Sequence, residues 1–346
     1  MQKLSDFDYY LPEGLIAQKP VQQRDSSRLL VLYRDSGLVE HRFFTDLIDY
    51  LNPGDCLVFN DTRVIPARLL GYKEGSGGDC ELLLLTPLGD DRWDALVRPA
   101  RRIKAGQRMV FETRHGRPAL MAEVVASFAG GKRVVQLEYD GDFDTVLSKV
   151  GHVPLPPYIK SGIDDPERYQ TVYARERGSV AAPTAGLHFT PRLLESLASH
   201  GVEQVFLSLH VGIGTFGPVR EERIEQHQMH IERYHLPNGA AEVINGCRSQ
   251  GGRVIAVGTT VTRTLETQAR DDGFVEPGQG ETDIFIYPGY RFRAVDGLVT
   301  NFHLPKSTLL MLVSAFAGRE RVLQAYRDAV SRSYRFFSFG DGMLVI

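Results

Sequence analysis

The sequence predicts an α/β layered domain into which an all-β, barrel-like domain is inserted. Three observations lead to this prediction. Residues 67–139 form short apolar runs divided by glycine-rich turns, the C-terminal half alternates strand-like and helix-like runs, and an apolar run at 56–59 precedes the insert and needs strand partners. We therefore expect a discontinuous α/β domain of residues 1–66 plus 153–346 and an inserted domain of residues 67–152.

Six short strands make up the expected insert. In the last of them, Val135, Leu137 and Tyr139 alternate with Gln136 and Glu138, which is the period of a half-buried strand. Short strands at near-regular spacing are typical of a small barrel or sandwich. The six strands are expected at 67–70, 81–86, 93–97, 107–111, 120–127 and 133–139.

Helix signals begin after the proline-rich segment 153–157. Thr190 is suited to cap a helix that starts at Pro191, and Gly201 follows the end of that helix. Alternation of strands and helices then favours a largely parallel sheet covered by helices. The expected elements are strand 202–211, a helix from Asn238 to near Gly251, strand 253–257, a helix that follows Gly258, strand 283–287, and helices 307–317 and 319–331.

Composition excludes several classes of protein. The 346 residues are 42% hydrophobic and 24% charged, with a formal net charge of -3, which is typical of an ordinary globular chain and not of a disordered or fibrous one. A nucleic-acid partner would have to be bound by a local basic patch. The longest apolar run, 309–317, is too short to cross a bilayer, and no signal-peptide core precedes residue 20, so we expect a cytoplasmic protein with no membrane partner.

Three motifs suggest metal or cofactor chemistry only weakly. Cys56, Cys80 and Cys247 lie far apart, so a zinc ribbon or a cysteine-ligated iron–sulfur cluster is not expected. The run 212–217 fits G-x-G-x-x-G, but Pro218 and a polar stretch follow it, which favours a tight glycine loop over a dinucleotide site. His227 and His230 could share a helix face, yet the spacing of the metal-binding His-Glu-x-x-His motif is missing, so no metal is assigned.

A dense basic stretch lies within the expected insert. Its cations could neutralise phosphates of a nucleic acid, or they could form a solvated strand edge that charge protects from pairing. The residues assigned to it as a candidate binding surface are Arg98, Arg101, Arg102 and Lys104, and Arg108, Arg114 and Arg117 follow.

Two segments could converge on one ligand. The loop 182–190 is small and apolar, carries His188 and ends at a helix N-terminus, and Gly258-Thr259-Thr260 stands at a second strand-to-helix turn. Backbone N–H groups at such turns can bind a ligand at the carboxyl edge of the sheet. Helix capping alone explains each segment separately, so the two readings stay open here.

Segments along the whole chain, among them 60–68, 181–190 and 301–307, carry distinctive motifs. These motifs resemble the S-adenosylmethionine:tRNA ribosyltransferase-isomerase family of queuosine biosynthesis. Departures from the family's usual residues occur at Gly217, Val261-Thr262, Phe339 and Gly342. The segments that carry the resemblance are 6–9, 15–20, 27–30, 54–55, 60–68, 154–159, 167–174, 181–190, 210–212, 214–216, 258–260, 263–266 and 301–307.

This resemblance implies an uncommon use of S-adenosylmethionine, as a ribosyl donor and with no permanently bound cofactor. The acceptor would be the 7-aminomethyl-7-deazaguanine base at the wobble position of tRNA, met through the anticodon stem-loop. The products would be epoxyqueuosine in tRNA, adenine and methionine. Such chemistry needs a base near ribose C5′, a proton donor for adenine and close placement of the attacking amine.

The matched motifs supply the candidate site residues. The candidates for proton transfer are His188, His210 and His303, which lie inside matched loops, and next Glu232, which lies outside them; the sequence does not rank them. The candidates for substrate binding are Thr184, Gly186, Gly258, Thr259, Thr260 and Arg263. Two rival functions remain at this stage: a metal-dependent hydrolase built on His227 and His230, and a non-catalytic RNA-binding protein that uses the basic stretch.

Overall fold

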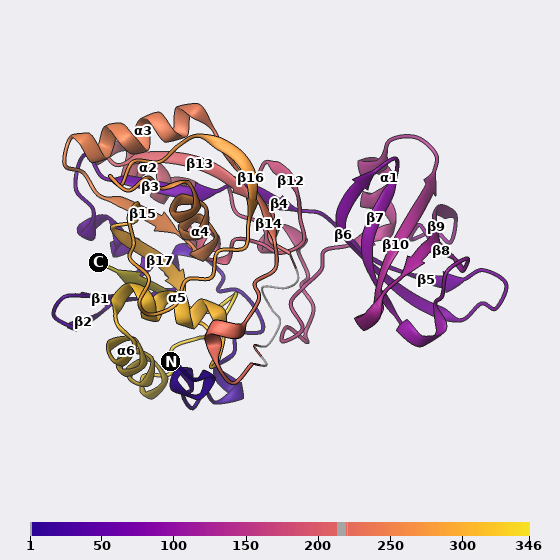
Figure 1. The fold of residues 1–346 in the computed structure, drawn as a ribbon, viewed down its shortest axis with the longest axis horizontal. Helices are drawn as coiled ribbons and strands as arrows, with labels where there is room; N and C mark the ends of the chain where they lie inside the picture. Colours follow the sequence, from indigo (N-terminus) through magenta and orange to yellow (C-terminus); the bar gives the residue numbers. More distant parts are fainter. Residues whose placement is uncertain (1, 213–218, 220) are drawn as a thin grey trace. The chain divides into compact units, whose positions relative to one another are not determined.

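The computed structural model describes residues 2–212, 219 and 221–346 of the chain (Figure 1). It divides into two compact units. The first comprises Met1–Arg63, Pro156–Glu176 and Ala182–Ile346, and the second comprises Val64–Leu155 and Arg177–Ala181. Each unit has its own sheet, so the two are described separately below.

A nine-stranded mixed sheet forms the centre of the first unit. Its order is β16-β14-β13-β3-β15-β17-β18-β1-β2. The four strands β13, β3, β15 and β17 run parallel, as do β18 and β1, and the remaining neighbours are antiparallel. The strands are β1 (Arg28–Leu32), β2 (Val39–Phe43), β3 (Cys56–Asn60), β13 (Glu203–Leu209), β14 (Glu232–Leu236), β15 (Val254–Val257), β16 (Gly278–Thr282), β17 (Gly297–Asn301) and β18 (Gly342–Val345).

Apolar side chains leave both faces of this sheet. Along β3, Cys56 and Val58 belong to one buried cluster, while Leu57 and Phe59 belong to the other, because successive side chains of a strand point to opposite faces. Helices cover both clusters, which makes three layers (Figure 1). One face carries α3 (Asn238–Ser249), α4 (Thr259–Gln268), α5 (Thr308–Ala317) and α6 (Arg319–Ser331), and the other carries α2 (Pro191–Ser199) and the 3-10 helix η4 (Phe44–Tyr50).

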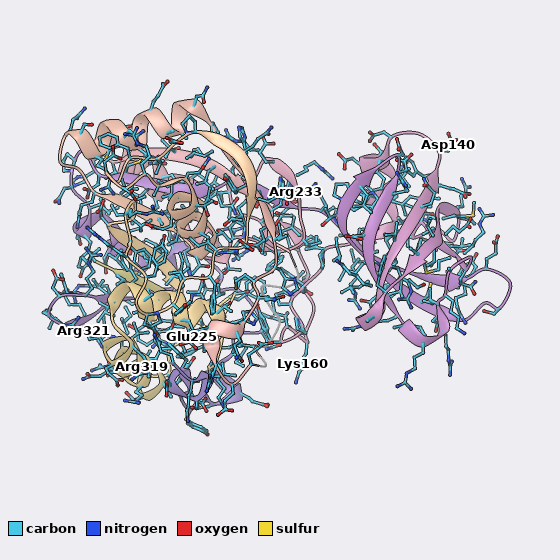
Figure 2. The ribbon with its side chains drawn as sticks, in the orientation of Figure 1. Asp140, Lys160, Glu225, Arg233, Arg319 and Arg321 are labelled. Atoms are coloured by element: carbon cyan, nitrogen blue, oxygen red, sulfur yellow. The ribbon has the colours of Figure 1, made fainter. Side chains whose placement is uncertain are left out.

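The layered α/β fold predicted for the flanking segments is confirmed. The strand at 56–59 joins the sheet as β3, between β13 and β15. Thr190 caps α2 as expected, since its hydroxyl accepts a hydrogen bond from the Leu193 N–H. Polar side chains of the first unit, including Lys160, Arg233 and Arg321, extend outward from this framework (Figure 2).

The strand predicted at 283–287 is wrong. Those residues have no regular structure, and the strand in this region is β16, which ends at Thr282. The side chain of Arg263 explains why the strand does not continue past Thr282. It donates a hydrogen bond to the Ile284 carbonyl, which a neighbouring strand would otherwise need as an acceptor. The apolar side chains that suggested a strand, such as Ile286, instead pack directly against the core.

The second unit is built on a closed antiparallel barrel, as the strand pattern predicts. Six strands follow the order β5-β6-β7-β10-β9-β8, and pairing of β5 with β8 closes the ring. They are β5 (Arg68–Lys73), β6 (Asp79–Gly89), β7 (Arg92–Arg98), β8 (Arg108–Glu112), β9 (Pro118–Ser127) and β10 (Lys132–Tyr139). The pattern did not predict α1 (Phe143–Val150), which follows the barrel strands and leads to β11 (Gly151–His152), an addition to β5.

Parallel pairing gathers several loops of the first unit at one edge of its sheet. The carboxyl ends of β13, β3, β15 and β17 share this edge, and so do the amino ends of β18 and β1, because β18 runs antiparallel to β17. Open α/β sheets bind ligands at such an edge. A separate two-stranded sheet pairs β4 (Thr62–Val64) with β12 (Glu176–Ser179). Of the helices in the described part of the chain, none has the length and apolar character needed to cross a membrane.

Candidate active site at the carboxyl edge of the sheet

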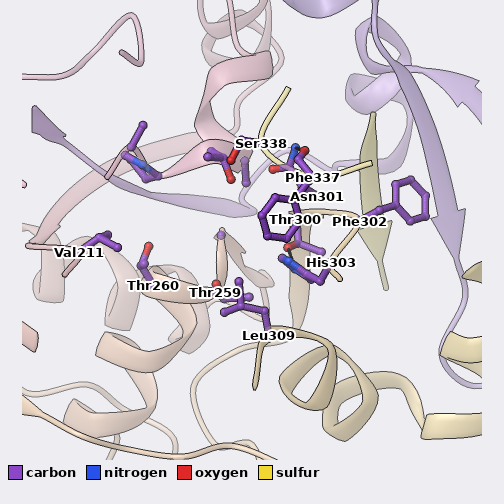
Figure 3. Close-up of a pocket in the computed structure, with 15 residues that line it drawn as sticks. Val211, Thr259, Thr260, Thr300, Asn301, Phe302, His303, Leu309, Phe337 and Ser338 are labelled. Carbon is purple, nitrogen blue, oxygen red and sulfur yellow. Dashed lines mark hydrogen bonds between the residues drawn. The ribbon is translucent and has the colours of Figure 1, made fainter. Parts of the chain in front are cut away.

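A cleft with about 540 Å³ of empty space lies at this edge (Figure 3). Three segments form most of its lining: 182–185, the start of α4 at 258–260, and 300–303 at the end of β17. The structure therefore brings together the candidates Thr184, Gly258, Thr259 and Thr260. The described residues of the lining include no Asp, Glu, Lys or Arg, so the cleft is bordered by hydroxyls, an amide, an imidazole and apolar groups.

The turn into α4 depends on Gly258. Its φ of +99° lies in a region that favours glycine. Its N–H donates to the Val299 carbonyl, which holds the turn against β17. On the other side, the amide of Asn60 at the end of β3 approaches the Thr260 hydroxyl at 3.4 Å and donates to the Leu209 carbonyl at 2.9 Å. Asn60 thereby links the ends of two strands to the first turn of α4.

His303 borders the cleft directly. Its Nε2 lies 2.8 Å from the hydroxyl of Thr300, and its Nδ1 makes no hydrogen bond to the described residues. The backbone is held from both sides, because the Tyr9 hydroxyl donates to the His303 carbonyl and the His303 N–H donates to the Tyr326 hydroxyl. Burial lowers the pKa of His303 to about 3, so the imidazole is neutral at physiological pH.

His188 is placed differently, although it is equally buried. Its Nδ1 lies 2.7 Å from the Ser27 hydroxyl, its Nε2 lies 3.1 Å from Asn301 Nδ2, and its ring stacks on Phe44. The same Asn301 nitrogen donates to the carbonyl of Phe337, which can only accept. The Asn301 amide is thus oriented with its nitrogen toward His188, so Nε2 accepts and Nδ1 carries the proton.

Both ring nitrogens of His188 are therefore occupied, and the ring is not part of the lining of the cleft beside His303. Its pKa falls to about 3, mainly through burial and further through the charges of Arg335 and Arg24. The carboxamide oxygen of Asn301 is buried and has no hydrogen-bond partner in the part of the chain that the structure describes. Asn301 lies in the lining and connects the His188 pair to the cleft.

The other proton-transfer candidates lie outside the lining of the cleft. His210 follows β13. Its Nδ1 is buried without a hydrogen-bond partner among the described residues, and burial lowers its pKa against the opposing charges of Glu176 and Asp61. Glu232 forms a buried ion pair with Arg263. In this pair the two candidates compensate each other's charge, and the pair joins β14 to α4.

Gly186 belongs to the packing behind the cleft. It lies in the 3-10 helix η8 (Thr184–His188), and a Cβ at this position would fall 2.1 Å from the Tyr173 hydroxyl oxygen. The glycine lets the loop approach the Tyr173 ring closely. We therefore assign Gly186 a structural role, which is to allow the conformation of this loop.

Two sequence motifs can be placed only in part. His227 Nδ1 lies 3.0 Å from a carboxylate oxygen of Glu221, and His230 is exposed. Among residues 2–212, 219 and 221–346, no group of three or more His, Cys, Asp or Glu side chains is arranged to hold a metal ion. Of the G-x-G-x-x-G run, only Gly212 is described; residues 213–217, including the departure at Gly217, lie outside the described residues.

The basic stretch of the second unit presents unpaired cations. They extend from the end of β7 into the loop that contains η5 (Ala100–Arg102), which the buried guanidinium of Arg133 supports by donating to the carbonyls of Ala100 and Ile103. Arg108 differs, because it pairs with Glu138 at 2.5 Å. The exposed side chains with no ion pair to a described residue include Arg98, Arg101, Arg102 and Lys104.

Comparison with known proteins decides the family. A family model described as queuosine biosynthesis protein matches residues 4–345. A relative from Symbiobacterium thermophilum, named S-adenosylmethionine:tRNA ribosyltransferase-isomerase, is 59% identical over 344 residues, which cover 99% of this chain and 100% of the relative. The chain belongs to the queuosine biosynthesis protein family. The family indicated by the sequence motifs is thus confirmed.

Further members of the family match over similar lengths. A relative of the same name from Moorella thermoacetica is 57% identical over 345 residues, which cover 99% of this chain and 100% of the relative. A crystal structure of S-adenosylmethionine tRNA ribosyltransferase from Thermotoga maritima matches with a TM-score of 0.55 and 40% identity, covering 99% of this chain and 100% of that one.

Sequence reasoning missed several residues of the cleft in this family member. Asn301, Thr300 and Ser338 line it, and Asn60 supports it, but none was among the candidates. Asn301 and Asn60 both stand at the start of motifs that carry the family resemblance. For Asn60 a further signal was available, because it directly follows the apolar run that was predicted as a strand, whereas β17, which ends at Asn301, was not predicted.

Proposed function

We propose that the cleft beside His303 is where this protein transfers and isomerises the ribosyl group of S-adenosylmethionine. The protein is an S-adenosylmethionine:tRNA ribosyltransferase-isomerase of queuosine biosynthesis, like its full-length relatives. The observation that carries the location is a neutral, hydroxyl-bearing cleft at the carboxyl edge of the sheet, with one buried histidine whose Nδ1 has no partner among the described residues.

The neutral lining suits the adenosine part of S-adenosylmethionine. Purine and ribose carry no charge, and their hydroxyl and amino groups can pair with the hydroxyls of Thr259 and Thr300 and with the orphan oxygen of Asn301. An unpaired buried acceptor costs about 1–3 kcal/mol, which a donor on the ligand would recover. The sulfonium and the amino-acid end of the substrate would then extend beyond this lining.

We assign proton transfer to His303. The sulfonium makes the neighbouring C5′ protons acidic, so a neutral imidazole beside C5′ can remove one of them. Loss of this proton breaks the C4′–O4′ bond, and the O4′ electrons form an aldehyde at C1′ as adenine leaves and takes up a proton. The aminomethyl nitrogen of the acceptor base adds to C4′ of the resulting vinyl sulfonium and loses a proton. The C5′ carbanion formed by this addition attacks the C1′ aldehyde, and the new oxyanion displaces methionine from C5′ to close the epoxide. The hydroxyl of Thr300 holds Nε2, so Nδ1 is the nitrogen that meets the substrate.

We also propose that the basic loop of the second unit binds phosphates of tRNA, with 7-aminomethyl-7-deazaguanine at the wobble position as the acceptor. Its four unpaired cations support this assignment within a chain of net charge -3. Phosphate contacts of this kind position the RNA and carry no sequence information.

Adenine release from S-adenosylmethionine in the presence of tRNA that carries the modified wobble base tests the function. The wild-type protein should release adenine only when both substrates are present. His303→Ala should lower saturating turnover by roughly 10²–10⁴-fold, the usual contribution of a general acid–base group. Thr300→Ser, which keeps the hydroxyl, should retain most of the activity, whereas Thr300→Val should not. Wild-type turnover in His303→Ala, with an unchanged circular dichroism spectrum, would refute the assignment.

A further inference from the structure

A second, smaller cleft of the first unit is lined by arginines. It has about 280 Å³ of empty space, and Arg24, Arg168, His188 and Ser338 are in its lining. Ser338 also lines the first cleft, and the hydrogen bond from Asn301 to His188 joins a residue of one lining to a residue of the other. The two clefts are therefore neighbours at the same edge of the sheet.

The two arginines of this second cleft form no ion pair with a residue that the structure describes, although the charges of Asp165 and Glu167 act on Arg24. Arg24 donates to the carbonyls of Leu187 and Glu167, and Arg168 donates to those of Val21 and Gln22. All four acceptors are neutral backbone groups. Neither guanidinium forms an ion pair with a described residue, and Nε of Arg168 is buried without any hydrogen-bond partner.

The nearby acidic groups are already engaged elsewhere. The Glu167 carboxylate pairs with Arg63, and the Asp165 carboxylate caps the N–H of Glu167. Arg335 adds a third cation whose charge reaches His188, and its guanidinium also donates to a backbone carbonyl, that of Lys19. Asp341, near Arg335, is held by the guanidinium of Arg28. Partly buried cations that are hydrogen-bonded only to neutral carbonyls favour an anionic ligand.

Two anions of the reaction could occupy such a site: the carboxylate of S-adenosylmethionine and a phosphodiester of tRNA. S-adenosylmethionine also carries a sulfonium and an ammonium, so its net charge is positive and three guanidinium groups would repel it. A phosphodiester belongs to a uniformly negative chain. A phosphodiester is also separated from its own base by only one sugar. The cationic cleft could therefore hold the phosphodiester while the neighbouring neutral cleft holds the base.

We propose that the cleft between Arg24 and Arg168 binds a phosphodiester of the tRNA strand next to the nucleotide that is modified. This inference rests on the proposed function, because it takes the first cleft as the reaction site. It adds a phosphate contact within the first unit to those proposed for the basic loop of the barrel. His188 would then serve as a neutral, hydrogen-bonded wall between the phosphate and the reaction site.

Paired substitutions distinguish two roles of the arginines: binding a phosphate, and acting as a structural clamp that only holds backbone carbonyls in place. Arg168→Gln removes the charge, whereas Arg168→Lys keeps the charge and loses the planar fork that bonds two carbonyls. Affinity for a labelled anticodon stem-loop RNA, measured over a salt series without S-adenosylmethionine, should fall about tenfold in Arg168→Gln. The slope of log affinity against log salt should shrink by about 0.7. Arg168→Lys should keep the wild-type slope.

Arg24→Gln and Arg24→Lys repeat the comparison at the second arginine, in case one pair folds poorly. Arg332→Gln is the matched control, because Arg332 is an exposed arginine of the same unit that pairs with Asp328. Circular dichroism checks the fold of each variant. The KM for S-adenosylmethionine should stay at its wild-type value throughout.

Three results would overturn the inference. Equal losses and unchanged slopes in the Gln and Lys variants would show a structural clamp. A raised KM for S-adenosylmethionine with wild-type RNA affinity would assign the cleft to the substrate carboxylate. Wild-type values in every variant would show that no ligand anion binds there. Failure of the wild-type protein to release adenine would instead refute the proposed function and leave the salt slopes as an independent result.

Discussion

His188 and His303 show how equal burial can accompany different hydrogen bonding. Both imidazoles are neutral because burial lowers their pKa to about 3. Both ring nitrogens of His188, however, are hydrogen-bonded, one to Ser27 and one to Asn301. In His303 only Nε2 is hydrogen-bonded to a described residue. A sequence motif names a histidine but does not show which of its nitrogens is engaged. For this reason the motifs nominated both residues and could not rank them.

The low pKa of these histidines predicts acid sensitivity. Between about pH 6.5 and pH 3 the unfolded chain binds protons at both positions and the folded chain does not, so the free energy of unfolding falls as pH falls through this window. Each histidine contributes a slope of up to about 1.4 kcal/mol per pH unit there, and none above pH 7. Urea unfolding of the wild type and of His303→Gln at several pH values measures this slope.

His303→Gln should lose stability less steeply in acid than the wild type, because one of the two histidines is gone. His115→Gln is the control, since this histidine lies at an exposed turn of the barrel unit. If the free energy of unfolding of the wild type and of His303→Gln changes equally with pH between pH 4 and pH 8, the prediction is contradicted.

Individual site residues were predictable where backbone chemistry marks them. A strand followed by Gly258-Thr259-Thr260 indicates a helix start at a ligand-binding edge, and the structure places all three residues in the cleft. Glu232 and Arg263 also lie in or near matched motifs, but they pair with each other across 31 positions of sequence. No local pattern reveals such a pair, so its members were proposed separately as a base and as a substrate ligand.

At the scale of elements, η8 depends on close packing of its glycine. Gly186→Ala would place a Cβ 2.1 Å from the Tyr173 hydroxyl oxygen and 2.8 Å from Cγ2 of Thr171. The Tyr173 ring packs against Phe59 and Phe206, which limits how far it can move. We expect a loss of about 1–3 kcal/mol in the free energy of unfolding, as for overpacked cores. Chemical denaturation measures it.

Gly246→Ala is the matched control for this prediction. Gly246 lies within α3, and nothing lies within 4 Å of a Cβ built there. Alanine should stabilise that helix by roughly 0.5–1 kcal/mol, since glycine is unfavourable in helix interiors. If Gly186→Ala has the free energy of unfolding of the wild type, the Tyr173 side chain moves away from the added methyl group without destabilising the fold.

Regular elements were predictable where one physical signal dominates. The six barrel strands are short apolar runs between clear turns, the last of them with alternating apolar and polar side chains, and all six are present. The strands β1, β2, β14, β16, β17 and β18 were not predicted. Of these, β17 and β18 are short and fully buried, so neither shows the alternation of a half-buried strand. At 283–287 the apolar signal was real but came from core packing, and the side chain of Arg263 replaces the strand ladder.

At the scale of the whole molecule, acidic and basic residues nearly balance, so local groups of unpaired cations must attract an RNA. The net charge of -3 gives no general attraction for a polyanion. Many surface arginines are engaged by acidic neighbours, as Arg332 is by Asp328. The basic loop of the barrel unit and the arginine cleft of the first unit are two places where cations stand without an ion-pair partner among the described residues.

The basic loop of the barrel provides the last prediction. Arg101→Ala combined with Arg102→Ala should raise the KM for tRNA and leave saturating turnover nearly unchanged, because phosphate contacts position the RNA and take no part in the chemistry. Both side chains are exposed and follow β7, so the fold should persist. The slope of log affinity against log salt should shrink by about 0.7–0.9 for each lost contact. If KM and slope keep their wild-type values, these residues form only a charged strand edge, and the contacts that hold tRNA must lie in the first unit.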